Sequence, residues 1–282
     1  RTQRLRPAGA GISLWSNGVK VLDALGLGPG IAAVGGDMRR MRYRDRDGTE
    51  LCEFSLDPLV DRVGERPYPV RRSDLQDLLL GAVGDVVELG VTCADVIDRG
   101  DRVCVAAEDG RTFEADLVVV ADGTNSRLRH VVAGEVERHY VGYHNWNGLV
   151  PAEIALGEVD SWTLHVGEGK RVSTMPVRDG HYFFFDVPLG EAVPDPTDPQ
   201  GTLRRHFVGW DERVQRLIDG IDPATVTNVA IHTHDPIGRY ADGLIRESIA
   251  SVRFDSLDQL RFGGDGSLRV VLVNPGIING RR

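Results

Sequence analysis

The stretch "DLVVVADGTNSRLR", residues Asp116 to Arg129, decides the fold. It starts as an apolar run over 117–121, stops at Asp122 and Gly123, and then turns polar. An apolar run without alternation predicts a strand that is buried on both faces, as in the parallel sheet of a doubly wound fold. Ligands in such folds collect beyond the carboxyl ends of the strands, which is where Asp122 and Gly123 fall.

The residues after this strand suit a polar ligand. A glycine at 123 lets the backbone turn and approach a ligand closely, and the Asp122 carboxylate can accept hydrogen bonds from sugar hydroxyls. Ser126 and Arg129 are predicted to begin the next helix, where free N–H groups and a guanidinium favour a phosphate. The alternative is a plain strand-to-helix turn capped by the aspartate, and the residues alone leave both readings open.

Composition restricts the class of protein. The 282 residues are enough for one large or two modest domains with a real core, and 41% hydrophobic with 27% charged residues is typical of a globular protein. A formal net charge of -9 predicts no nucleic-acid partner and no membrane-surface binding. The arginines of "MRRMRYRDRDG" (38–48) are interleaved with acids and predict a solvated, self-paired face.

The cysteines and the hydropathy pattern point to a cytoplasmic protein. Cys52, Cys93 and Cys104 are odd in number and form no C-x-x-C pair, so we expect neither a disulfide framework nor a cysteine zinc site. No apolar stretch approaches the roughly 20 residues of a transmembrane helix, and the first residues lack the apolar core of a signal peptide.

Periodicity predicts a mixed α/β (α+β) chain, in which helices alternate with short strands up to about residue 140 and long strands dominate after it. Helices are expected over 14–27, from Ser73 or Asp74 onward, and over 202–221. Hairpins are expected around Asp47-Gly48 and Asp109-Gly110. From Tyr140 on, long strands joined by glycine turns predict a separate antiparallel sheet.

At this point the sequence resembles a known family. D-G-x-x-S-x-x-R, found here as Asp122, Gly123, Ser126 and Arg129, is similar to the second fingerprint of the class A flavoprotein monooxygenases, the para-hydroxybenzoate hydroxylase family. Other matching stretches run in family order from about residue 1 to 243, most like the bacterial urate hydroxylases: "PAGAGISLWSNGVKVLDALGLG", "RPYPVRRSDLQ", "VGYHNWNGLV", "VGEGKRVSTMPV", "HYFFFDVPLG" and "GWDERVQRLIDGIDPATVTNVAIHTHDPI".

The resemblance implies a Rossmann-like FAD-binding domain that carries an antiparallel substrate sheet. The implied boundaries are 1–135 for the FAD-binding domain, 136–235 for the sheet, and 236–282 for a return to the first domain. The implied reaction is hydroxylation of an electron-rich aromatic or heteroaromatic ring, such as the purine urate, with FAD, NAD(P)H and O2. The alternatives are another flavoprotein oxidoreductase with the DG fingerprint, or a non-catalytic fragment of such an enzyme.

The resemblance also assigns residues to the cofactor. It implies that Ser13 lies where the chain passes the flavin and that Arg72 starts a helix whose arginine reaches toward FAD. The segment around Cys93 runs by the adenine and contributes its backbone. Asp122 helps shape the FAD site and the groove for the nicotinamide donor.

Arg171 and Tyr182 are implied to face the substrate, as the catalytic pair. A guanidinium at 171 can hold an anionic heteroaromatic ring and stabilise developing negative charge, and the phenol at 182 can fix the ring with a hydrogen bond. Composition alone favours a surface charge for Arg171 and a core position for Tyr182. The match to the family reverses that preference.

Two parts of the family pattern are not found in these 282 residues. The first is the opening strand with G-x-G-x-x-G, for which "GAGISL" (9–14) is no substitute because it lacks the third glycine. The second is the G-D-A-x-H loop after a late strand, because "GGDG" (263–266) precedes its apolar run and predicts a hairpin turn instead. We therefore expect an incomplete FAD-binding domain and a divergent or truncated tail over 236–282.

Two other groups of residues could suggest a metal site or a hydrolase, and the sequence supports neither function. His232, His234 and Asp235 place two imidazoles on one strand face, but no third ligand follows at a typical spacing, so we expect a structural role and no metal. Ser126 has no G-x-S-x-G elbow around it, which argues against a hydrolase.

Overall fold

A computed structural model describes residues 11–123, 125–192, 194, 197–239, 241–243, 245–247, 270–274 and 277–280. Its contacts divide the chain into two compact units. The first, called here the DG unit, holds Val83–His139 and the described residues from Thr233 on; the second, the sheet unit, holds the described residues up to Ala82 and Tyr140–His232. The division by function into 1–135, 136–235 and 236–282 stays a prediction.

The DG unit contains the strand that the opening stretch predicts. β9 (Leu117–Val120) pairs in parallel with β16 (Ile245–Glu247) on one side and with β17 (Val270–Asn274) on the other. The sheet has the order β15-β16-β9-β17-β18-β5, with β15 at Ala241–Asp242, β18 at Ile277–Gly280 and β5 at Val87–Leu89. A three-stranded sheet consists of β6 (Cys93–Asp98), β7 (Val103–Ala107) and β8 (Thr112–Ala115). The unit also has a short 3-10 helix η1 (Gly84–Val86) and helix α5 (Arg129–Ala133).

Burial explains why β9 is a run of valines. Val118 and Val120 are almost fully buried and pack with Val103 and Val105 of β7 and with Val132 of α5. Parallel strands in the interior of a sheet need apolar side chains on both faces. The "GGDG" turn predicted at 263–266 lies outside the described residues.

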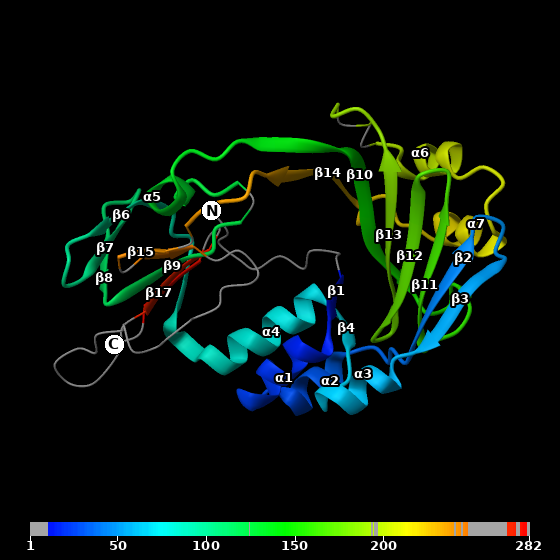
Figure 1. Ribbon diagram of the computed structural model, residues 1–282, viewed down its shortest axis with the longest axis horizontal. Coiled ribbons are helices and arrows are strands. Elements are labelled where there is room, and N and C mark those ends of the chain that lie inside the picture. The colour runs from blue at the N-terminus through cyan, green and yellow to red at the C-terminus, as the bar shows by residue number, and fades with distance from the viewer. Residues whose placement is uncertain are drawn as a thin grey trace. The chain divides into compact units, whose positions relative to one another are not determined.

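The sheet unit is built on seven strands in the order β14-β10-β13-β12-β11-β2-β3. The bounds are β14 Thr227–His234, β10 Arg138–Pro151, β13 Gly180–Pro188, β12 Lys170–Val177, β11 Ser161–Gly167, β2 Arg40–Asp45 and β3 Glu50–Ser55. Figure 1 shows these strands side by side. The antiparallel pairs confirm the expected sheet, and the expected hairpin around Asp47-Gly48 joins it through a parallel pairing of β2 with β11.

One face of this sheet is covered by two helices. α6 (Pro199–His206) and α7 (Glu212–Asp219) bring Leu203, Leu217 and Ile218 against Phe183 and Phe185 of β13. Phe207, between the helices, meets the Phe185 ring edge-on at 5.0 Å between centroids. Alternation along β13 therefore sends its odd-numbered aromatic residues into this core and its even-numbered ones to the opposite face.

The N-terminal elements complete the sheet unit. They are β1 (Gly11–Leu14), α1 (Ser16–Ala24), α2 (Gly28–Val34), α3 (Asp57–Val63), β4 (Tyr68–Arg71) and α4 (Arg72–Val83). β1 and β4 pair with each other, and the backbone at Gly36 lies so close to Pro176 O of β12 that a Cβ would be 2.1 Å from it. Among the described residues, no helix has the length and apolar character needed to cross a membrane.

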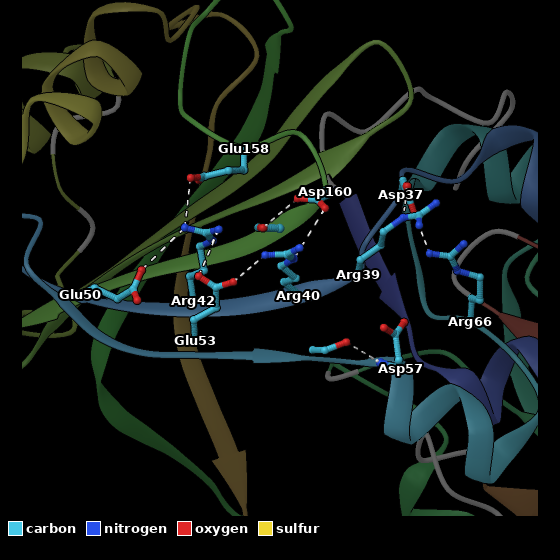
Figure 2. A network of polar contacts seen from close by, with 12 residues as sticks. Asp37, Arg39, Arg40, Arg42, Glu50, Glu53, Asp57, Arg66, Glu158 and Asp160 are labelled. Atoms are coloured by element: carbon cyan, nitrogen blue, oxygen red, sulfur yellow. Dashed lines mark hydrogen bonds and ion pairs between the residues drawn. The ribbon is translucent and has the colours of Figure 1, made fainter.

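The arginines of 38–48 lie on the β2–β3 hairpin and are paired as expected. Figure 2 shows Arg40 bonded to Glu53, at 2.9 Å, and Arg42 bridging Glu53 and Glu158 at 3.1 and 3.0 Å. Arg39 binds Asp37 at 2.7 Å in the same network. Exposed pairs of this kind contribute little to stability, because water and salt screen the two charges. The neighbouring carboxylates therefore offset the charges of these arginines, as expected for a solvated, self-paired face and not for a phosphate-binding patch.

Candidate functional site

Polar side chains gather at the middle of the sheet face that α6 and α7 do not cover. The register places Arg171 of β12 and Asn145 of β10 directly opposite Asp186 of β13, one on each side. Tyr182 and Phe184 follow on the same face of β13, because residues two apart point the same way. Period-two alternation thus builds a polar and aromatic patch on three adjacent strands.

Arg171 is held from two directions. Its Nε donates to Asp186 Oδ2 at 2.8 Å, and its Nη2 donates to the same oxygen. Its Cζ lies 5.0 Å from the centroid of the Phe184 ring, a cation–π contact. The Arg171 side chain is still 46% exposed. The outer edge of the guanidinium therefore faces outward with its orientation fixed, ready for an anionic or carbonyl-bearing ligand.

Asp186 is the buried member of this group, at 8% exposure. Its second oxygen accepts a hydrogen bond of 2.7 Å from Nδ2 of Asn145. The Oδ1 of Asn145 accepts one of 2.8 Å from Nδ2 of Asn147. A chain of hydrogen bonds therefore runs from the guanidinium across β13 to β10.

Tyr182 lies against the start of β1. A Cβ at Gly11 would be 2.4 Å from Tyr182 Cγ, so the ring fills the space above that glycine. Burial raises the pKa of the Tyr182 phenol, and the negative charge of Asp186 raises it further. The phenol is therefore protonated at neutral pH and is available as a hydrogen-bond donor.

Ser13 and Arg72 are in the same unit as this patch. Ser13 is half-buried in β1 and pairs with Pro69 of β4. Arg72 is exposed and is the first residue of α4, directly after β4. The cofactor roles predicted for these two residues stay predictions.

Cys93 and Asp122 lie in the DG unit and close to each other. Burial raises the pKa of the Cys93 thiol to about 11, and the charges of Asp122 and Asp95 act in the same direction, against a backbone hydrogen bond at Asp95. Such a thiol is inert as a nucleophile at neutral pH. The backbone role beside the adenine that the family resemblance implies for the Cys93 segment stays a prediction.

The turn after β9 has the geometry that the DG motif predicts. Gly123 adopts φ +86°, in the left-handed region that favours glycine. Asp122 Oδ2 accepts a hydrogen bond of 3.0 Å from the backbone N–H of Arg127. The prediction that Ser126 begins the helix is wrong: α5 starts at Arg129, and Ser126 belongs to the turn, its N–H bonded to Gly123 O at 2.9 Å. The left-handed glycine closes this extra turn before the chain can become helical.

The region around this turn fits a polar ligand. A cleft of about 820 Å³ is lined by residues of the turn and of the segment after α5, including Asn125, Ser126, Arg129 and Arg138. The hydroxyls of Ser126 and Thr92 are buried and have no hydrogen-bond partner among the described residues. Buried hydroxyls normally have partners, so these two suit the hydroxyl- and phosphate-rich part of a dinucleotide such as FAD.

The sequence alone did not single out Asp186, Asn145, Asn147 or Phe184. The available signal was the stretch "HYFFFDV", in which an acid ends an alternating aromatic strand. A carboxylate that shares a strand face with aromatic side chains needs hydrogen-bond donors where that face is buried, so such an acid is a candidate for a site residue.

The histidines of "HTHD" have protein partners. His232 Nε2 lies 3.1 Å from Glu191 Oε1 and its Nδ1 lies 2.9 Å from Ala230 O. His234 Nδ1 lies 2.6 Å from Asp235 O. Within the part of the chain that the structure describes, no group of three or more histidine, cysteine, aspartate or glutamate residues could hold a metal ion.

Comparisons with known proteins give the family. No family model matches the chain. The FAD-dependent urate hydroxylase of Klebsiella pneumoniae is 44% identical over 248 residues, which are 86% of this chain and 65% of that enzyme. The 3-amino-4-hydroxybenzoate 2-monooxygenase of Streptomyces cremeus is 32% identical over 286 residues, covering 100% of this chain and 72% of that enzyme.

A solved structure agrees with these relatives. Klebsiella pneumoniae HpxO complexed with FAD and uric acid superimposes with a TM-score of 0.83 at 43% identity, over 87% of this chain and 64% of that one. The chain thus spans just under two thirds of the length of the urate hydroxylases it matches. It belongs to the family of class A FAD-dependent monooxygenases.

Proposed function

We propose that the chain is part of an FAD-dependent monooxygenase that hydroxylates an electron-rich heteroaromatic ring, with urate or a related purine as the substrate. The observation that carries this proposal is the Arg171 guanidinium, which Asp186 holds over Phe184. The same sheet face carries the protonated Tyr182, whose ring centroid lies 6.1 Å from that of Phe184. A planar fork of donors over an aromatic ring, with a phenol further along the same face, matches a flat ring that carries carbonyl oxygens and a negative charge.

Each residue has a defined task in this proposal. Arg171 binds the anionic edge of the substrate and stabilises the negative charge that grows on its oxygens during hydroxylation. Tyr182 donates a hydrogen bond that fixes the orientation of the ring. Phe184 provides an apolar floor that limits access of water. When bound, FAD would supply the redox chemistry with NAD(P)H and O2.

For the cofactor we propose Ser13, Arg72, Cys93 and Asp122, with the roles given by the family resemblance. The unpartnered hydroxyl of Ser126, in the DG turn, supports the assignment of Asp122. The unpartnered hydroxyl of Thr92, the residue before Cys93, supports the assignment of the Cys93 segment. The free cysteines Cys52, Cys93 and Cys104 support a reducing compartment, and we propose the cytoplasm.

The test has two stages. First, the purified chain is titrated with FAD; quenching of flavin fluorescence is expected, and a chain that leaves FAD fluorescence unchanged favours the non-catalytic alternative. Second, O2 uptake is followed with NADH or NADPH, with and without urate. Uptake that depends on urate and yields a hydroxylated product supports the proposal; NAD(P)H oxidation without product favours a different flavoprotein oxidoreductase.

A pair of variants tests the residue assignment. Arg171→Gln removes the charged fork and is expected to raise the KM for urate by about tenfold or more, since hydrogen bonds between ionised partners are worth about 1.5–3 kcal/mol each. Arg204→Gln is the control, because Arg204 forms an exposed ion pair with Asp219 on the helical side. Equal KM values for the two variants would contradict the role of Arg171.

A further inference from the structure

The Asp186 carboxylate is largely shielded from water, which would otherwise supply its hydrogen-bond donors. It is 8% exposed, and a buried carboxylate must find hydrogen-bond donors or lose its charge. Both of its oxygens accept hydrogen bonds. Oδ2 accepts from Nε and Nη2 of Arg171, and Oδ1 accepts from Nδ2 of Asn145. The carboxylate therefore bridges three strands, β12, β13 and β10.

Asn145 is itself oriented. Its Oδ1 accepts a hydrogen bond of 2.8 Å from Asn147 two residues along β10, and this leaves its Nδ2 directed at Asp186. The amide cannot turn over without losing both bonds. The direction of each hydrogen bond is thus fixed: Asn147 donates to Asn145, and both Asn145 and Arg171 donate to Asp186.

We propose that Asp186 is the positioning residue of this site, holding the Arg171 guanidinium in one orientation through the carboxylate and its Asn145–Asn147 support. The ligand that Arg171 binds rests on the proposed function, whereas the orientation of Arg171 rests on hydrogen bonds within this chain. A long arginine side chain that is 46% exposed has many rotamers, and it loses that freedom when a ligand fixes it. Fixing it before the ligand arrives removes that cost from binding.

The pairing also affects what Arg171 recognises. Because Asp186 offsets part of the charge of the guanidinium, a ligand is selected by the direction of the remaining N–H bonds as well as by its own charge. Lysine at 171 would keep the charge and lose the fork, so Arg171→Lys should not restore binding that Arg171→Gln abolishes.

The first experiment needs neither FAD nor urate. In the ¹⁵N-labelled chain, NMR measures hydrogen exchange of the Arg171 Nε–H, which Asp186 protects. Asp186→Asn is expected to accelerate this exchange by about tenfold, the change that loss of about 1.4 kcal/mol of protection produces. Asp219→Asn, which breaks the exposed pair with Arg204, is the control and should leave it unchanged. Unchanged exchange in Asp186→Asn would overturn the proposal.

The second experiment measures urate binding to the chain by calorimetry. Asp186→Asn is expected to weaken binding by about tenfold in the wild-type background and by less than about twofold in the Arg171→Gln background, because a residue that acts through another has no effect once that one is gone. Equal effects in both backgrounds would overturn it, since a merely structural role adds independently.

If Asp186→Asn does not fold, as judged by circular dichroism, Asn145→Ala replaces it and should accelerate Arg171 Nε–H exchange by about threefold; no acceleration overturns the proposal. If the wild-type chain binds no urate, the proposed function fails, while the exchange measurement still decides the positioning role.

Discussion

Gly11 shows how a single backbone position supports the site. The "GAGISL" stretch does not carry the dinucleotide fingerprint, and the structure gives its second glycine a packing reason instead: a Cβ there would lie 2.4 Å from Cγ and 2.7 Å from Cβ of Tyr182. These are distances that no side chain tolerates without movement of the ring or of β1.

We therefore expect Gly11→Ala to lower the free energy of unfolding by about 1–3 kcal/mol, the usual cost of overpacking, and to weaken urate binding because Tyr182 is displaced. Gly18→Ala in α1 is the matched control. Nothing lies within 4 Å of the Cβ it would add, so alanine there should stabilise by about 0.5–1 kcal/mol through helix propensity. Urea denaturation checks both, and equal effects would contradict the packing argument.

At this scale, the sequence predicted the chemistry of single residues only through the family resemblance. Without the resemblance, the sequence predicts a surface charge for Arg171 and a core position for Tyr182. Their partner Asp186 was not predicted, because its importance comes from hydrogen bonds to residues 15 and 41 positions away. Local pattern carries no information on such pairs.

His165 connects two elements of the sheet unit, β11 and the start of α7. Its Nε2 lies 3.6 Å from Asp211 Oδ2, with both side chains less than 10% exposed. Asp211 also caps α7 by accepting from the N–H of Arg213 at 2.7 Å. Burial lowers the pKa of His165; Asp211 opposes this shift, and Arg44 and Arg213 add to it.

The sign of the pH effect follows from that direction. Because the pKa of His165 is lower in the folded state than its usual value of about 6.5, the unfolded state takes up the proton first as the pH falls. The stability is full above about pH 6.5 and declines as the pH drops toward the folded-state pKa. His181 and His206 are shifted in the same direction by burial and add to the effect.

We expect His165→Gln to flatten this decline. One proton fewer taken up on unfolding reduces the slope by at most about 1.4 kcal/mol per pH unit. Urea denaturation at pH 7, 6 and 5 measures the slope, and His130→Gln, at an exposed position of the DG unit, is the control. A variant that keeps the wild-type slope would show that His165 is not responsible.

Elements were predicted better than their pairing. The glycine turns at Asp47-Gly48 and Asp109-Gly110 follow from local turn chemistry, and the structure confirms them. The helix expected from Ser73 or Asp74 is present, but it starts at Arg72, so neither residue is its cap. The single helix expected over 202–221 is wrong: the segment forms α6 and α7, separated by a break in which Gly209 adopts φ +73°. The parallel pairing of β2 with β11 joins residues more than 100 positions apart. No local signal encodes that choice, because any strand edge with suitable alternation can accept the hairpin.

At the scale of the whole molecule, the fold class follows from the sequence and the grouping of segments does not. The buried strand before Asp122 and the antiparallel strands after Tyr140 predict the two sheets. That the described residues up to Ala82 belong with Tyr140–His232 is a matter of long-range contacts, such as β4 beside β12. Each unit consequently has its own core, with Val118 in one and Phe185 in the other.

Separate cores predict separate responses to core mutations. Val118→Ala in β9 removes two buried carbon groups, at about 2 kcal/mol, and Phe185→Ala in β13 removes a ring, at about 3–5 kcal/mol. Because cooperative opening follows contiguous packing, Val118→Ala should accelerate amide exchange in β7 and β9 and leave β12 and β13 protected, and Phe185→Ala should do the reverse. Hydrogen exchange followed by mass spectrometry resolves these strands. If either variant accelerated exchange equally in both sets of strands, the two cores would form one cooperative unit, and the division of the chain into two separately stable units would have to be abandoned.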